Sequence, residues 1–156
     1  MNSHLTDVEL RVHEALSSVD DPEYPGVSIV DLGLLERLHV TADGLVRIGL
    51  IPTFSGCPAL AMIADDVTTA VRSVRGVGHV ELAWLAAPVW TVDRIGPETR
   101  ARLGREFTVA VQVGSSVPRC PRCGTRTELQ SMFGPSRCRS VHRCPSCSET
   151  VEVMRS

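Results

Sequence analysis

The sequence predicts an α+β protein in which a small domain of two helices and a short sheet is followed by a cysteine-rich module. Three observations support this. Apolar residues recur at helical spacing in two segments, and short strand-like runs lie between and after them. Two Cys-Pro-x-Cys motifs occur at 120–123 and 144–147. We place the α/β domain at residues 5–86, a connecting segment with a short helix at 87–117, and the cysteine-rich module at 118–156.

The elements of the first domain follow in the order helix, strand, strand, helix, strand. Residues 6–18 form the first helix, with capping-box spacing between Thr6 and Glu9. After the turn-forming DDPEYPG, the later part of SIVDLGLLERLHV and the run LVRIGLI form a hairpin around TADG. The second helix follows PTFSGCP and stops at Gly76, and the third strand carries Val80, Leu82 and Trp84 on one face. A compact sheet covered on one side is therefore expected.

The connecting segment holds two further elements. A short helix starts near Pro97, where proline fits the first helical turn. The apolar run FTVAVQV is either an edge strand or a docking arm.

Charge and composition exclude several classes of protein. The net charge is −2, but residues 1–117 carry 9 Arg and 15 acids (−6), whereas residues 118–156 carry 7 Arg and 3 acids (+4). No nucleic-acid or membrane partner is indicated, because no basic block occurs and no segment approaches the roughly 18 apolar residues of a membrane span. We expect a cytoplasmic protein, since the first residues lack the pattern of a signal peptide.

The strongest motif is a pair of cysteine knuckles, CPRC at 120–123 and CPSC at 144–147. Their separation is typical of four thiolates, Cys120, Cys123, Cys144 and Cys147, around one structural zinc ion, as in a zinc ribbon. Redox chemistry at one Cys-x-x-Cys is the rival interpretation, but that motif belongs at a helix start in a βαβ unit. Cys138 and His142 lie between the knuckles and either replace a ligand or are ordinary residues of the ribbon, which we prefer.

Zinc binding also bears on the partner of this module. Four thiolates and Zn²⁺ add a charge of about −2, which lowers the positive charge of the module. Phe133 is its one aromatic residue, and nucleic-acid binding needs several exposed aromatics among the arginines. The ribbon is therefore expected to dock on a partner protein.

A second candidate site centres on Cys57 in TFSGCP. Pro58 fits the first position of the second helix, so Cys57 would lie at or next to its N-cap, where free N–H groups favour a thiolate. Thr53 and Ser55 would add hydrogen bonds. The equally weighted alternative is a cysteine that acts as a small apolar residue.

Carboxylates in the preceding turn belong to the same hypothesis. Asp21, Glu23 and Asp31 lie in DPE and IVDLG. They either face Cys57 and assist its chemistry, or act as turn and cap residues that accept hydrogen bonds from nearby N–H groups.

The stretch DPEYPGVSIVDLGLLERLHV followed by PTFSGCPAL resembles the MIP18 family, also called the DUF59 domain, whose members are small α/β proteins associated with iron–sulfur cluster assembly. WTVDRIGPETRARLG, CPRCG, FGPSRCRS and the closing CPSC narrow the resemblance to the PaaD (PaaJ) type of phenylacetate-degradation protein. The resemblance covers nearly the whole chain. It implies an accessory factor of the oxygenase that converts phenylacetyl-CoA to its ring 1,2-epoxide, not an enzyme in itself.

The resemblance also implies roles for particular residues and partners. Cys57 would be the reactive thiol and a transient ligand of iron or a cluster, surrounded by Asp21, Glu23, Asp31, Thr53 and Ser55, and Cys138 matches a further cysteine of the pattern. The implied partners are oxygenase and reductase subunits and iron–sulfur assembly proteins. A homodimer is one way to complete the ligands of a cluster. The alternatives are a structural adaptor of the oxygenase, an assembly factor for another client, or a thiol oxidoreductase.

Overall fold

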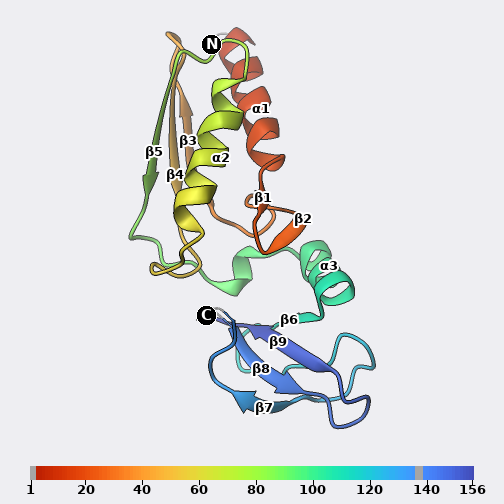
Figure 1. Ribbon diagram of the computed structural model, residues 1–156. Coiled ribbons are helices and arrows are strands. Elements are labelled where there is room, and N and C mark those ends of the chain that lie inside the picture. Colours follow the sequence, from red (N-terminus) through yellow and green to blue (C-terminus); the bar gives the residue numbers. More distant parts are fainter. Residues whose placement is uncertain (1–2, 136–138) are drawn as a thin grey trace. The chain divides into compact units, whose positions relative to one another are not determined.

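The structure is a computed structural model that describes residues 3–135 and 139–156 (Figure 1). The chain divides into two compact units. The first comprises Met1–Pro52 and Pro58–Val89, and the second comprises Thr53–Cys57 and Trp90–Ser156. Both units contain helices and strands, as expected for a protein of the α+β class.

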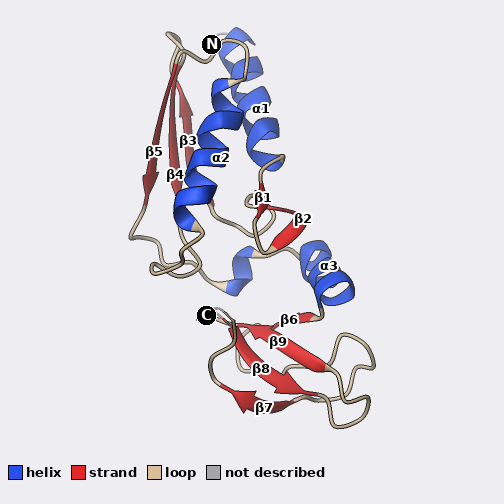
Figure 2. Cartoon of the chain, viewed as in Figure 1, coloured by secondary structure: helices blue, strands red, loops and turns tan. Residues whose placement is uncertain are grey.

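The first unit is a three-stranded sheet covered by two helices. Helices α1 (Ser3–Ser17) and α2 (Leu60–Arg72) lie beside the sheet of β3 (Leu35–Val40), β4 (Leu45–Leu50) and β5 (His79–Trp84), as Figure 2 shows. The strand order is β3-β4-β5. Strands β3 and β4 form an antiparallel hairpin, whereas β5 runs parallel to β4 and is reached through α2. The predicted order of helix, strand, strand, helix, strand is confirmed.

The apolar periodicity of the sequence explains the packing of this unit. In α2 the buried residues are Ile63, Val67 and Val71, which are four apart and therefore lie on one face of the helix. The central strand β4 buries both Val46 and Ile48. Together with buried apolar residues of α1, these two elements supply much of the core.

Several boundaries differ from the sequence-based expectation. Helix α1 starts at Ser3, so Thr6 lies inside it and is not its N-cap, and α2 ends at Arg72 and not at Gly76. The predicted turn DDPEYPG is instead a small antiparallel ribbon of β1 (Asp20–Asp21) and β2 (Tyr24–Ser28). The Asp20 carboxylate holds it by accepting a 2.8 Å hydrogen bond from the Gly26 N–H.

The second unit contains a four-stranded sheet preceded by two helical segments. These are the 3-10 turn η1 (Val92–Arg94) and α3 (Pro97–Phe107), which has Pro97 in its first turn. The sheet order is β6 (Val109–Val111), β9 (Thr150–Met154), β8 (Arg139–Arg143) and β7 (Glu128–Ser131). Strand β6 runs parallel to β9, and the other pairs are antiparallel. The run FTVAVQV thus contributes an edge strand.

None of the helices in the described part of the chain has the length and apolar character that a membrane span requires. The longest, α1, has 15 residues.

Candidate metal centre and the Cys57 loop

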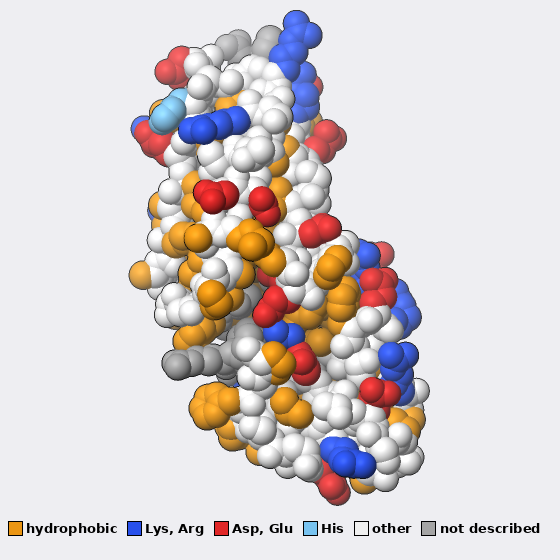
Figure 3. All heavy atoms as spheres, in the orientation of Figure 1, with side chains coloured by type: hydrophobic (Ala, Val, Ile, Leu, Met, Phe, Trp, Pro, Cys, Tyr) orange, Lys and Arg blue, Asp and Glu red, His pale blue; other side chains and the backbone are white. Residues whose placement is uncertain are grey.

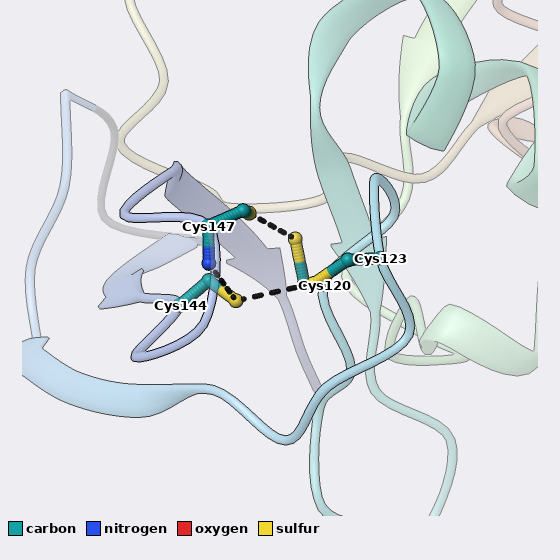
Figure 4. A group of neighbouring side chains, drawn as sticks. All are labelled: Cys120, Cys123, Cys144 and Cys147. Atoms are coloured by element: carbon teal, nitrogen blue, oxygen red, sulfur yellow. Dashed lines mark hydrogen bonds between the residues drawn. The ribbon is translucent and has the colours of Figure 1, made fainter.

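The four knuckle cysteines converge on one point of the second unit (Figure 4). The Sγ atoms of Cys120 and Cys147 are 3.7 Å apart, those of Cys123 and Cys144 are 3.4 Å apart, and all four lie within 4.8 Å of one another. Disulfide sulfurs would be about 2.05 Å apart. Four Zn–S bonds of about 2.3 Å in a tetrahedron place the sulfurs about 3.8 Å apart. The cluster therefore fits a single tetrahedral metal ion.

The two knuckles share the same backbone hydrogen bonds. In the first, the Cys120 N–H donates to Thr125 O (2.9 Å) and the Gly124 N–H donates to Cys120 O (2.8 Å). In the second, the Cys144 N–H donates to Glu149 O (2.9 Å) and the Ser148 N–H donates to Cys144 O (3.0 Å). Each turn folds the second cysteine back towards the first, so the backbone conformation of the knuckle brings its two sulfurs together.

Both turns contain a residue with a positive φ, but only the first turn has a glycine there, which the sequence alone would indicate. Gly124 has φ 75° and Ser148 has φ 63°, both in the left-handed region. Glycine adopts this region freely, whereas an L-residue such as serine does so at a cost. Nothing in the sequence CPSCSE reveals the strained position of Ser148.

The cysteines differ in their exposure to solvent. Cys120 and Cys144 are buried and form a small apolar cluster with Val151 and Val153, whereas Cys123 and Cys147 are exposed. A core of this size is too small to stabilise the ribbon alone, so a metal bound by the cysteines would supply much of its folding free energy.

The surroundings of the two exposed cysteines, Cys123 and Cys147, shift the pKa values of their thiols in opposite directions. The Thr125 hydroxyl and backbone lower the pKa of Cys123 to about 6, with a smaller effect from Cys144. At Cys147 the Glu149 backbone favours the thiolate, but desolvation and the neighbouring sulfurs outweigh it and raise the pKa to about 12. A bound cation would deprotonate all four thiols, because its charge exceeds these local effects.

His142 lies in a buried polar chain behind the knuckles. The Thr127 hydroxyl donates to Pro118 O (3.0 Å), so its oxygen accepts from Nδ1–H of His142 (3.0 Å). Nε2 of His142 then accepts from the Ser140 hydroxyl (3.2 Å). Both ring nitrogens are used, so His142 is not placed as a metal ligand. Cys138, the other candidate replacement, lies outside the described residues.

The structure corrects the expected position of Cys57. Helix α2 begins at Leu60 with Ala59 as its N-cap, because Pro58 and Ala59 form a turn ahead of the helix. Cys57 is two residues before that N-cap, so the helix-terminus argument for its thiolate no longer applies.

The loop around Cys57 has a local cause for its glycine. The Cys57 thiol is half-buried, and its N–H donates to Phe54 O (3.1 Å). A Cβ on Gly56 would lie 2.7 Å from the Phe54 ring, so glycine allows that ring to lie against the backbone. In the same loop Thr53 is half-buried and Ser55 is exposed.

Two of the three predicted carboxylates, those of Asp21 and Asp31, accept hydrogen bonds in local turns of the first unit. Asp21 accepts a 2.8 Å hydrogen bond from the Glu23 N–H. The Asp31 carboxylate accepts a 3.4 Å hydrogen bond from the Ser28 N–H, and the Asp31 N–H donates to Ser28 Oγ (3.0 Å). That these carboxylates also act on Cys57 stays a prediction.

Comparison with known proteins relates both parts of the chain to described families. Residues 9–82 match the family model "Iron-sulfur cluster assembly protein", and residues 106–155 match "PaaD zinc beta ribbon domain". A protein of Escherichia coli K12, provisionally named as one of the subunits of 1,2-phenylacetyl-CoA epoxidase, is 36% identical over 93% of each chain.

Two further relatives cover the first part of the chain. An Fe-S protein maturation auxiliary factor of Porphyromonas gingivalis is 36% identical over 67% of this chain and 98% of its own length. The crystal structure of a DUF59 domain from Bacillus anthracis superposes with a TM-score of 0.60 and 28% identity, over 65% of this chain and 96% of that one.

Proposed function

Because the chain belongs to the PaaD-type family, in which an iron–sulfur cluster assembly domain is joined to a zinc ribbon, we propose that it is a non-catalytic maturation factor. Its clients are the oxygenase and reductase subunits of the system that converts phenylacetyl-CoA to its ring 1,2-epoxide. It helps to assemble their iron or iron–sulfur centres. The name of the Escherichia coli relative supports the choice of system, and the names of the maturation factors support the role.

The observation that carries this proposal is that Cys57 lies apart from the four cysteines of the metal centre. Four of the five described cysteines form the tetrahedral cluster, which leaves Cys57 as the described cysteine outside it. Cys57 lies in a loop and is half-buried, so its thiol is accessible in part. These features support Cys57 as the thiol that handles the cargo.

Cluster chemistry requires ligands from elsewhere. Iron–sulfur clusters take about four protein ligands, whereas Cys57 supplies one. The others come from the client, from a small thiol or from a second copy of the chain. Transfer to a client follows naturally when the client's own cysteines complete the set.

The ribbon binds zinc and docks on the client. Strand β7 is the edge of its sheet and all four of its residues are exposed. Leu129, Met132 and Phe133 present exposed apolar side chains on and after this strand. Exposed apolar groups beside an open strand edge are typical of protein interaction surfaces.

The test is to produce the oxygenase and reductase subunits together with the wild type, Cys57→Ser or Cys144→Ser, and to measure iron and acid-labile sulfide in the purified clients. We expect Cys57→Ser to retain one zinc per chain but to leave the clients poor in iron, and Ser115→Ala, in an exposed turn, to match the wild type. Cys144→Ser should lose zinc and client binding.

The same experiment separates the competing functions. If clients made with Cys57→Ser carry normal iron while Cys144→Ser abolishes binding, the chain is a structural adaptor. If neither variant affects these clients but another iron–sulfur protein becomes iron-poor, the chain serves a different client.

A further inference from the structure

A cavity of about 490 Å³ lies within the second unit, between α3, β6 and the segment 116–121. Its volume falls in the range of about 300–1,000 Å³ typical of sites for small ligands. The proposed function assigns no role to it. The cavity contains neither Cys57 nor any of the four clustered cysteines.

The walls of the cavity combine apolar and cationic side chains. Val109, Val111, Val117 and Pro118 supply apolar surface, and Arg100, Arg105 and Arg119 are its charged lining residues. The lining includes no carboxylate. Any ligand of this cavity therefore meets cationic side chains beside an apolar wall.

Two of these arginines have unused hydrogen-bonding capacity. The Nε atom of Arg100 is buried and has no hydrogen-bond partner. Within the described residues, neither Arg100 nor Arg105 forms an ion pair, whereas Arg102 on the same helix pairs with Glu106 at 3.1 Å. Figure 3 shows basic and acidic side chains gathered over α3. A buried donor without a partner is unfavourable, so a shift of the Arg100 side chain that brings its guanidinium to an acceptor on a ligand would be favourable.

The third arginine connects the cavity to the metal centre. Arg119 donates from Nη1 to Gly124 O (3.0 Å) in the first knuckle. Pro121, between Cys120 and Cys123, also lines the cavity. The first knuckle thus forms part of the wall.

We propose that this cavity binds a carboxylate attached to an apolar group. The planar guanidinium groups match the geometry of a carboxylate, and the valine and proline surface covers the apolar part. This chemistry is offered by two sources, a free organic acid and the terminal carboxylate of an apolar protein tail. Both contain the recognised group, and the probes below distinguish them.

The test is a titration of the zinc-loaded, ¹⁵N-labelled full chain followed by NMR. The probes are octanoate and the peptide acetyl-Val-Val-Leu with a free carboxyl end, and the matched controls are octanamide and the same peptide as its amide. We expect at least one acid to produce saturating shifts at Val109–Val111 and at residues 116–119, and its neutral counterpart to bind at least roughly tenfold more weakly.

Variants show whether the arginines are responsible. The double variant Arg100→Gln with Arg105→Gln should weaken binding by at least roughly tenfold, while Arg102→Gln, outside the cavity, should bind as the wild type does. A spectrum and zinc content like those of the wild type show that the double variant is folded. Binding of octanoate alone identifies a free acid as the ligand, and binding of the peptide alone identifies a protein tail.

Three results would overturn the proposal. The first is the absence of saturation by either acid up to about 10 mM, because most specific sites bind more tightly than that. The second is equal binding of the acids and their neutral controls. The third is an unchanged affinity for the acid in the double variant. Each can occur while Cys57 functions as proposed, so the two proposals are tested independently.

Discussion

The left-handed residues of the two knuckles predict how substitutions change zinc affinity. Gly124 has φ 75°, and a Cβ added there would meet nothing within 4 Å, so Gly124→Ala changes only the backbone preference. The left-handed conformation costs an L-residue about 1–2 kcal/mol, and the reduced freedom of the unfolded chain returns about 0.4–1 kcal/mol. The net loss is about 1 kcal/mol.

The same argument has the opposite sign in the second knuckle. Ser148 already carries the cost at φ 63°, so Ser148→Gly should gain up to about 1 kcal/mol. Because metal binding is coupled to folding of the knuckle, these energies correspond to a roughly fivefold loss of zinc affinity for Gly124→Ala and a gain of up to roughly fivefold for Ser148→Gly.

The assay is competition for zinc with a chromophoric chelator, at one pH and one ionic strength for all variants. Ser148→Ala is the matched control, because alanine and serine have similar left-handed preferences, and its affinity should equal that of the wild type. Gly114→Ala carries the same backbone cost at φ 62° outside the knuckles. If Gly124→Ala binds as tightly as the wild type, or Ser148→Gly binds more weakly, backbone conformation does not control the affinity.

Two further predictions concern stability. Burial and the charge of Arg155 lower the pKa of His142, so its neutral form is favoured in the folded chain. The stability that this histidine contributes is full above its unfolded pKa of about 6.5 and is lost as the pH falls through the lower folded pKa. The melting temperature of His142→Gln should therefore fall less between pH 7 and pH 5 than that of the wild type. An equal fall in both proteins would show that His142 does not contribute this pH-dependent stability. In the first unit, a Cβ on Gly49 would lie 2.7 Å from Leu85 Cδ1 and 3.2 Å from Arg37 Cβ. Gly49→Ala should cost about 1–3 kcal/mol in urea unfolding, and a stability within about 0.5 kcal/mol of the wild type would show that the sheet adapts without strain.

Much of the first unit was predictable, because its signals are periodic and local. The spacing of Ile63, Val67 and Val71 identifies α2, and the alternation around TADG identifies the hairpin of β3 and β4. The β1–β2 ribbon was missed, since its proline and glycine residues indicate a turn and no sequence pattern reveals the hydrogen bond from the Gly26 N–H to the Asp20 carboxylate.

At the candidate sites, the spacing of residues in the sequence predicted their positions where the chain closes a short local turn. It did not predict them elsewhere. The Cys-x-x-Cys pairs brought four sulfurs together because each knuckle is a local turn. Pro58 suggested a helix start two residues too early, because proline is equally suited to the turn that precedes the helix. The arginines of the cavity carry no motif, since they come from α3 and from residue 119 and meet only in the folded unit.

The unequal exposure of the cysteines sets the route by which the ribbon would lose its metal. Exchange of a zinc ligand begins with an incoming thiol, chelator or oxidant, and such a molecule reaches the exposed Cys123 and Cys147 before the buried Cys120 and Cys144. The rate of metal release should thus depend on which reagent is present, even where the equilibrium affinity is unchanged. In a cell, the lifetime of the docking module would follow the supply of small thiols and oxidants.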